Sequence, residues 1–209
     1  MKKILTYICC FYSFNALATE KQIYSNKLNH CTITRSTMND YEPEIFQSNN
    51  NLLRKTGQQP IYCGRKIIIK GRVLDQNCVP VSDAKIYLWQ KGCDGKYPYK
   101  TLRNRVNKKL LNFSSFASFT GSGTATTNNK GEFYFITIYP DAATSKAADV
   151  NIRVEHRNLE SLQTTLHLSS KNANVDQCGE TDSKLVAIAD EIQSYYFDVV
   201  VKGTTTRRY

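Results

Sequence analysis

Alternating apolar and polar positions run through most of the chain after residue 65 and predict short β-strands. Val150, Ile152 and Val154 alternate with polar residues, which is the pattern of a strand with one buried face. Runs of β-branched and aromatic residues, bounded by turn residues, predict five more strands, at 67–74, 85–89, 131–138, 162–168 and 195–201. Only residues 184–192 have a composition that suits a helix. The fold is therefore expected to be all-β, and short strands separated by turns favour a β-sandwich.

Polar segments precede, interrupt and follow these strands. Residues 19–64 are polar and weakly periodic, and residues 91–130 are rich in Gly, Ser, Asn and Lys. We interpret the first segment as an N-terminal extension and the second as a long excursion between two strands. The sandwich would occupy residues 65–203, and residues 204–209 would form a C-terminal tail.

The first 18 residues have the three parts of a secretory signal peptide. Lys2 and Lys3 precede a short apolar run, and Ala16-Leu17-Ala18 ends it with small residues at the cleavage positions. The apolar run is shorter than the ~20 residues that a membrane-spanning helix needs. We expect cleavage after Ala18, export to the periplasm or beyond the cell, and no transmembrane span in the mature chain. An N-terminal strand or a membrane anchor is the alternative interpretation.

The chain is basic, with 28 Lys and Arg against 18 Asp and Glu and a net charge of +10. Cleavage removes Lys2 and Lys3 and no acid, so the mature charge is 10 − 2 = +8. A basic surface attracts anionic partners such as lipid head groups or acidic polymers. The basic residues are scattered along the sequence, however, so solubility is the expected role of this charge and no nucleic-acid partner is expected.

Five cysteines remain after cleavage, which are Cys31, Cys63, Cys78, Cys93 and Cys178. In an exported chain at least one disulfide is expected among them, with one thiol left over. The sequence leaves their connectivity open. No spacing of cysteines and histidines suggests a zinc site.

Several short motifs follow one another in a fixed order through the strand region. They are G-R-V-L-D at 71–75, V-P-V at 79–81, A-K-I-Y-L-W-Q at 84–90, D-G-K-Y at 94–97, G-E-F-Y-F-I-T-I-Y-P at 131–140 and F-D-V-V-V-K-G at 197–203. In this order they resemble the intradiol ring-cleavage dioxygenases, such as protocatechuate 3,4-dioxygenase and catechol 1,2-dioxygenase. The resemblance covers about residues 50–203 and implies a β-sandwich with long loops. Chance similarity among β-sandwiches is the alternative.

The resemblance also implies a chemistry. Members of that family hold a non-haem Fe(III) with two tyrosines and two histidines, bind a catecholate on the metal, and insert O2 so that the ring opens between its hydroxyl-bearing carbons. For this chain the resemblance therefore implies Fe(III) as cofactor, with a catechol-type aromatic and O2 as substrates.

When the family's four metal ligands are aligned with this sequence one by one, the resemblance implies that only one of them is kept. The tyrosine that follows the Trp-Gln pair falls on Tyr97, whereas the second tyrosine position falls on Ala143, which cannot bind a metal. The paired histidines fall on Asp149 and Asn151, which offer oxygen donors in place of imidazoles. Each retained or substituted side chain also has a structural interpretation, because Tyr97 can simply pack and Asp149 and Asn151 can be solvated strand residues.

Two further positions would contact the substrate if the resemblance holds. Lys146 falls on the basic residue before the paired ligands, and Thr165 lies in the segment that corresponds to the family's T-Q-L-Y. If the metal site is placed elsewhere, Tyr139 with His156 or His167 is the next candidate set. His156 falls on the same alternate positions as Val150, Ile152 and Val154, the apolar residues of its strand. The alternative to a metal ligand is therefore a histidine in the core or at its rim.

Three functions remain open on this sequence. The first is a divergent dioxygenase that still uses Fe(III). The second is an exported β-sandwich that binds a ligand without catalysis, and the third is a basic adhesion or assembly protein of the cell envelope. A metal site needs its full ligand set, so the replacement of ligands at positions 143, 149 and 151 favours a non-catalytic protein. The sequence specifies neither the substrate nor the oligomeric state.

Overall fold

The structure is a computed structural model that describes residues 30–113, 118–140, 148–168, 173–174 and 192–203. These residues form eight strands and one short 3-10 helix: β1 (Lys66–Asp75), β2 (Lys85–Trp89), η1 (Lys108–Leu110), β3 (Ser122–Thr126), β4 (Glu132–Ile138), β5 (Ala148–Glu155), β6 (Leu162–Leu168), β7 (Ala173–Asn174) and β8 (Gln193–Val201). The part of the chain that the structure describes contains no helix long and apolar enough to cross a membrane.

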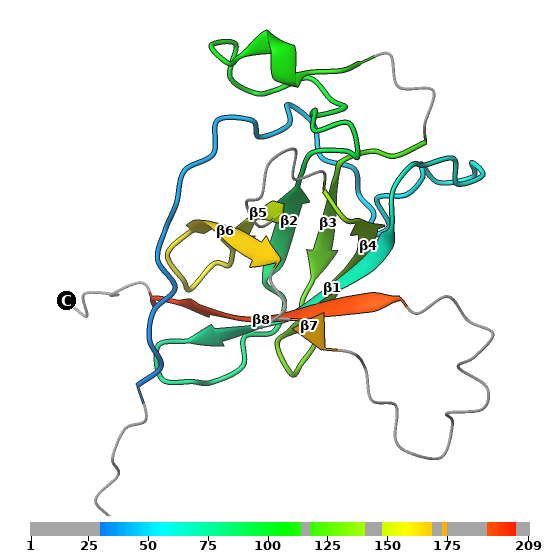
Figure 1. The fold of residues 1–209 in the computed structure, drawn as a ribbon. Coiled ribbons are helices and arrows are strands. Elements are labelled where there is room, and N and C mark those ends of the chain that lie inside the picture. Colours follow the sequence, from blue (N-terminus) through cyan, green and yellow to red (C-terminus); the bar gives the residue numbers. More distant parts are fainter. Residues whose placement is uncertain (1–29, 114–117, 141–147, 169–172, 175–191, 204–209) are drawn as a thin grey trace, which may run out of the picture.

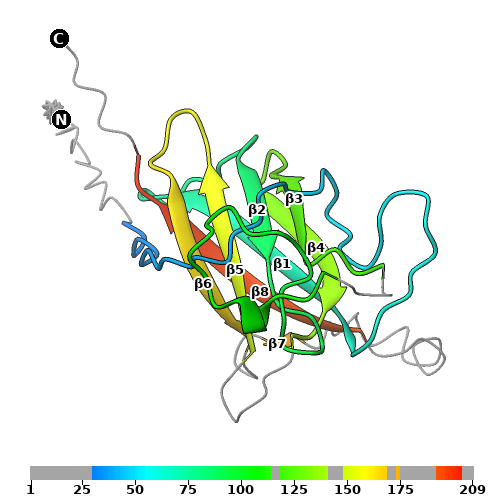
Figure 2. The ribbon, with the colours of Figure 1, turned by 90° about the horizontal axis from the view of Figure 1, so that it is seen from above.

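The strands form two four-stranded sheets, with the orders β4-β1-β8-β7 and β3-β2-β5-β6, as Figures 1 and 2 show. β1 pairs antiparallel with β4 and parallel with β8, whereas β2 pairs antiparallel with both β3 and β5. The expected all-β sandwich is therefore confirmed. We call the first group the β1 sheet and the second the β2 sheet.

The core lies between the two sheets and is built from alternate strand positions. Ile67, Ile69 and Val73 of β1 are fully buried, and so are Leu88 of β2 and Ile152 of β5. Alternation places their chain neighbours on the outer faces of the sheets. The outer face of the β2 sheet therefore carries the odd-numbered residues of β2 and β5, and the candidate site lies on that face.

Gly71 occupies an inward position of β1 where a side chain has no room. A carbon added there would lie 2.5 Å from the ring of Phe133 and 2.8 Å from the carbonyl oxygen of Phe197. The glycine that opens the first motif therefore lets an aromatic ring of the neighbouring strand fill the core.

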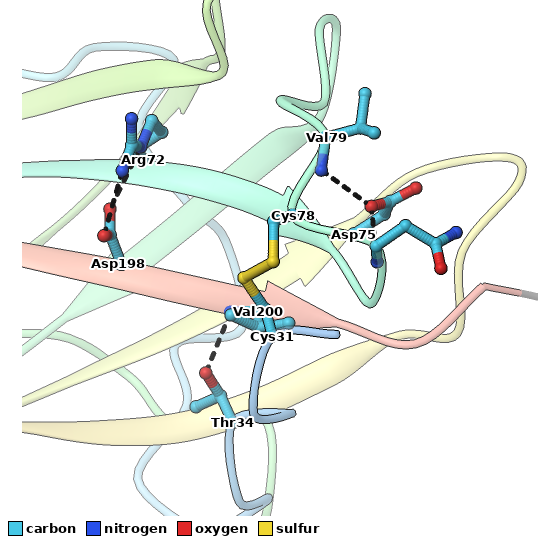
Figure 3. Close-up of a disulfide and its surroundings, with 9 residues drawn as sticks. Cys31, Thr34, Arg72, Asp75, Cys78, Val79, Asp198 and Val200 are labelled. Atoms are coloured by element: carbon cyan, nitrogen blue, oxygen red, sulfur yellow. Dashed lines mark hydrogen bonds and ion pairs between the residues drawn. A yellow bond between two sulfur atoms is a disulfide. The ribbon is translucent and has the colours of Figure 1, made fainter. Parts of the chain in front are cut away.

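A segment without regular strands, the N-terminal strap (residues 30–49), lies along the outer face of the β2 sheet (blue in Figure 1). A disulfide joins Cys31 to Cys78, and the Thr34 hydroxyl accepts a hydrogen bond from the N–H of Val200 (Figure 3). The N–H of Thr34 also donates to the carbonyl of Val200. Further on, Thr37 donates its N–H to the carbonyl of Gln163 in β6.

The strap ends at the opposite edge of the sandwich. Thr124 of β3 donates its N–H to the carbonyl of Asn49, and Leu52 donates to Ile136 of β4. The segment thus crosses the whole β2 sheet and then joins the edge of the β1 sheet.

Two disulfides link described residues, Cys31 to Cys78 and Cys63 to Cys93. The expectation of at least one disulfide is confirmed, and the pairing that the sequence left open is assigned. Cys178 lies outside the described residues, as do residues 184–191 of the segment with helical composition.

One expectation about the strands was wrong. Residues 91–130 are not an uninterrupted excursion, because Ser122–Thr126 form β3 and pair with β2. Small residues are required there, since a side-chain carbon at Gly123 would lie 2.2 Å from the carbonyl oxygen of Asn49. Close contact with the strap therefore accounts for a strand without large apolar residues.

Candidate functional site

Strand register brings three polar or amphipathic side chains into one row across the outer face of the β2 sheet. Trp89 of β2 pairs with Asn151 of β5, and Asn151 pairs with Thr165 of β6. The next row toward the start of β5 holds Asp149 and His167. Asp149 and Asn151, which the resemblance aligns with two metal ligands, therefore lie on the same face of the sheet.

Tyr97 reaches this face from the loop that follows β2. The N–H of Gly92 donates to the carbonyl of Lys96, and the N–H of Tyr97 donates to the carbonyl of Leu110. These bonds fix the backbone on both sides of the tyrosine, whose side chain is only 3% exposed.

Burial raises the pKa of the Tyr97 phenol above its ordinary value of 10.0, and the nearby carboxylate of Asp149 acts in the same direction. Side-chain hydrogen bonds with Asn39 and Asn151 lower the pKa but do not cancel the effect of burial. Tyr97 is consequently a neutral phenol at physiological pH, bonded to two carboxamides.

Asn151 is buried and satisfied by its neighbours. Its Oδ1 accepts a hydrogen bond from the Thr165 hydroxyl at 3.1 Å, and its Nδ2 donates to the Trp89 carbonyl at 3.5 Å. The Thr165 hydroxyl also lies 3.0 Å from that of Thr37 in the strap. Asn151 is 3% exposed, so its interpretation as a solvated strand residue was wrong. The strap covers what would otherwise be an open sheet face.

Asn39 brings the strap into the same group of side chains. Its Oδ1 accepts from the indole Nε1 of Trp89 at 3.1 Å and from the N–H of Tyr41 at 2.9 Å. We call Asn39, Trp89, Tyr97, Asn151 and Thr165 the polar network. Its members come from the strap, from the loop after β2 and from three strands.

Aromatic packing closes the strap over this network. The ring of Tyr41 stacks on that of Tyr97, with centroids 4.7 Å apart and planes inclined by 10°. Phe46 packs edge-on against Trp89, with ring centroids 5.9 Å apart. An ion pair between Glu42 and Arg153 of β5 adds a charged contact beside these rings.

The edge of the network is open to solvent. Nδ1 of His167 lies 2.6 Å from Oδ1 of Asp149, and the two side chains are 67% and 50% exposed. Asp149 is thus an exposed strand residue, as expected from the alternative to a ligand role. Within the described residues, no three or more His, Cys, Asp or Glu side chains are grouped closely enough to hold a metal ion.

The structure brings together four of the residues that the resemblance indicated, which are Tyr97, Asp149, Asn151 and Thr165. Ala143 and Lys146 lie outside the described residues.

The alternative metal-site candidates Tyr139 and His156 lie away from the polar network, whereas His167 lies at its edge beside Asp149. Tyr139 packs against Arg65 and Tyr195 beyond the end of β4. His156 follows the other end of β5, where its Nδ1 accepts from the N–H of Asn158 at 3.3 Å. Sequence reasoning missed Asn39 and Tyr41, because they lie in a polar extension without strand periodicity.

Comparison with known proteins identifies the family. A family model described as dioxygenase matches residues 38–171. A protein of Rickettsia bellii, whose name assigns it provisionally to the dioxygenases, is 53% identical over 209 residues, the full length of both chains. The chain belongs to the intradiol ring-cleavage dioxygenase family.

More distant relatives agree with this assignment. The protocatechuate 3,4-dioxygenase beta chain of Burkholderia cepacia is 30% identical over 79 residues, which are 38% of this chain and 31% of that protein. The fold is similar to an intradiol ring-cleavage dioxygenase from Tetranychus urticae, with a TM-score of 0.58 and 15% identity, covering 82% of this chain and 95% of that one.

A second solved structure shares the sandwich. The 3-chlorocatechol 1,2-dioxygenase of Rhodococcus opacus has a TM-score of 0.54 at 18% identity, covering 82% of this chain and 72% of that one. At these identities the likeness establishes the fold of this family member and leaves its chemistry to the side chains of the site.

Proposed function

We propose that this intradiol dioxygenase-family protein is exported and no longer carries an Fe(III) ring-cleavage centre, so that it acts by binding a ligand. The observation that carries this proposal is the environment of Asn151. At a position that corresponds to a histidine ligand, the carboxamide is buried and bonded to Thr165 and Trp89. A side chain satisfied in this way stabilises the fold and leaves no donor directed at a metal.

The other side chains at the ligand positions also fit Fe(III) poorly. Tyr97 already has side-chain hydrogen bonds with Asn39 and Asn151, and the Asp149 carboxylate lies against His167. Forming an iron centre would require breaking hydrogen bonds of the polar network, so no catalytic step through iron is assigned to these residues.

The strap supports the same proposal on steric grounds. An aromatic substrate next to Tyr97 would have to displace the stacked ring of Tyr41. The strap is joined to the sandwich by the Cys31–Cys78 disulfide and by the Glu42–Arg153 ion pair. Access to Tyr97 would therefore require a tethered segment to leave its position.

A ligand has room on the opposite side of the molecule. A groove of about 920 Å³ lies along the outer face of the β1 sheet and its edge, lined in part by Tyr134, Tyr196 and Asn50. The Tyr196 hydroxyl donates to Asp198, which Arg72 in turn holds with two hydrogen bonds of 3.1 Å. A groove with an ordered aromatic ring and nearby amide groups suits a binding function.

Export is part of the proposal. The signal-peptide pattern of residues 1–18 supports it, and two disulfides are typical of a protein that folds in an oxidising compartment. Mass spectrometry of the chain recovered from expressing cells tests this point. Thr19 at the N-terminus is expected, and a mature protein that retains Met1 would contradict it.

A divergent dioxygenase is the second candidate. It is favoured by the retained Tyr97, whose pKa responds to the charge of Asp149, and by the pairing of that carboxylate with His167 at the open edge. These three side chains include a phenol, a carboxylate and an imidazole, which are donors that iron accepts. The strap would have to move before they could converge.

Oxygen uptake distinguishes the two candidates. The mature protein is supplied with Fe(III) and then with catechol or protocatechuate, and O2 consumption and ring-opened product are measured. We expect no turnover above that of Fe(III) alone. Turnover that is lost in Tyr97→Phe and retained in Tyr134→Phe, a change at an exposed tyrosine, would establish the dioxygenase instead.

A further inference from the structure

The loop that carries Tyr97 continues into a closed excursion, which we call the basic loop (residues 98–113). Its two ends are paired, because the N–H of Tyr97 donates to Leu110 at 2.8 Å and the N–H of Asn112 donates to the carbonyl of Tyr97 at 3.0 Å. In Figure 1 this green loop, which contains η1, extends beyond the ends of the strands. Pairing at the base gives the loop a defined position on the sandwich.

The basic loop contains no acid. Between Asp94 and Glu132 the chain has seven basic residues and no Asp or Glu, and five of them lie in the loop: Lys100, Arg103, Arg105, Lys108 and Lys109. These five residues are close together in the sequence, and the paired loop places them beyond the ends of the strands (Figure 1).

The strap neutralises only part of this charge. Lys100 pairs with Glu44 at 2.7 Å, and Arg103 pairs with Asp40 at 2.8 Å. Among the described residues, Arg105, Lys108 and Lys109 have no acidic partner within ion-pair distance. Three exposed cations therefore remain available to an external anion.

Two of these cations are consecutive residues of a capped turn. Lys108 and Lys109 lie in η1, which begins where the Asn107 carboxamide accepts a hydrogen bond from the N–H of Lys109 at 3.1 Å. A capped turn limits the conformations of the backbone that carries both side chains.

Large apolar side chains lie beside the cations. Leu102 is 57% exposed and Phe113 is 62% exposed. Phe113 also borders a cavity of about 440 Å³ that it shares with Lys100 and Lys108. Basic residues combined with exposed apolar side chains are typical of surfaces that bind the membrane interface.

We propose that the basic loop binds the surface of an anionic phospholipid membrane. The uncompensated cations complement the negative surface potential, and Phe113 and Leu102 enter the boundary between head groups and acyl chains. A soluble polyanion would contact the cations and leave both apolar side chains in water, so the exposed phenylalanine and leucine favour a membrane. This inference is independent of whether the protein binds iron.

Co-sedimentation with lipid vesicles tests the proposal on the mature, oxidised protein. The probes are phosphatidylcholine vesicles with and without phosphatidylglycerol. Binding is expected only with the anionic lipid, and it should weaken when salt is raised from about 0.1 M to about 1 M, which shortens the Debye length from about 10 Å to about 3 Å. Equal binding to both vesicles, or none to either, would overturn the proposal.

Substitutions assign the binding to the loop. The double variant Lys108→Gln/Lys109→Gln is expected to bind about 25-fold more weakly, from about fivefold for each lysine near an anionic surface. The matched control Lys55→Gln/Lys130→Gln removes two exposed lysines outside the loop and should change binding by less than about twofold. Equal effects of the two double variants would contradict a specific role for the loop.

Phe113→Ser separates a membrane from a soluble polyanion. It should weaken vesicle binding about tenfold or more, because a buried phenylalanine side chain is lost from the interface, and it should leave binding to dextran sulfate unchanged. Binding to dextran sulfate without binding to anionic vesicles would reject the membrane and identify the partner as a soluble acidic polymer.

Discussion

The ring of Tyr41 lies face to face with that of Tyr97, at a centroid separation of 4.7 Å. One tyrosine comes from the N-terminal strap, and the other is the residue that the sequence resemblance aligns with a metal ligand of the intradiol dioxygenases. The contact therefore places one of the chain's own aromatic side chains against the candidate ligand Tyr97. The same contact therefore holds the strap and, under the proposed function, covers Tyr97.

Tyr41→Ala should destabilise the protein. Partial burial of the ring and its stacking on Tyr97 together contribute about 2 kcal/mol to the free energy of unfolding. Tyr41→Phe keeps the stacked ring and should change that free energy by less than about 0.5 kcal/mol. Denaturant unfolding measures both values. A Tyr41→Ala effect no larger than that of Tyr134→Ala, at a half-exposed tyrosine, would show that the strap is not held by this contact.

Stability should fall as the solution becomes strongly alkaline. Burial raises the pKa of both Tyr97 and Tyr99 above 10.0 in the folded protein, whereas both ionise near that value when unfolded. Above pH 10 the folded state then binds more protons than the unfolded state, so the stabilisation present below pH 10 decreases as pH rises. Unfolding free energies between about pH 8 and about pH 11 measure the slope. Tyr97→Phe should make it shallower, and an unchanged slope would place this tyrosine in solvent.

Removal of the Cys31–Cys78 disulfide should release the start of the strap. The bond closes a segment with a sequence separation of 47, and its loss is expected to destabilise the protein by about 3–4 kcal/mol. Limited proteolysis of Cys31→Ser/Cys78→Ser should cut within residues 30–49 earlier than in the native protein. Cys63→Ser/Cys93→Ser removes the other disulfide and should leave the strap protected. Equal cleavage of the strap in both variants would contradict this assignment.

Gly123→Ala should disturb the passage of the strap over β3. The added carbon would meet the carbonyl oxygen of Asn49 at 2.2 Å, so the backbone must shift, at a cost of roughly 1–3 kcal/mol. Gly203→Ala is the control, because no atom lies within 4 Å of a carbon added there. Thermal unfolding compares the two variants, and a native-like melting temperature for Gly123→Ala would mean that the strap packs less closely.

The strand region was largely predictable from sequence. The strands at 85–89 and 162–168 have the predicted boundaries, and the others differ by one or two residues at an end. Their signal is local, because side-chain alternation and turn residues are set by neighbours along the chain. β3 had no such signal, since its small residues are selected by contact with the strap.

The candidate site was predictable only in part, for a different reason. The resemblance indicated Tyr97, Asp149, Asn151 and Thr165, which the fold brings near one another. The burial of Asn151 depends on a strap that has no periodic pattern and is ordered by hydrogen bonds and a disulfide to distant residues. Those contacts are tertiary, so a sequence pattern alone does not reveal what covers the sheet.

The central claim is that Tyr97 and Asn151, which the resemblance aligns with metal ligands, belong to a polar network instead of an iron centre. Its most direct test is the iron content and visible absorbance of the mature protein after exposure to Fe(III) and removal of free metal. The account predicts a colourless protein with far less than one iron per chain, and no change in Tyr97→Phe. One tightly bound iron per chain, with a visible tyrosinate–Fe(III) absorption that disappears in Tyr97→Phe and persists in Tyr134→Phe, would contradict it.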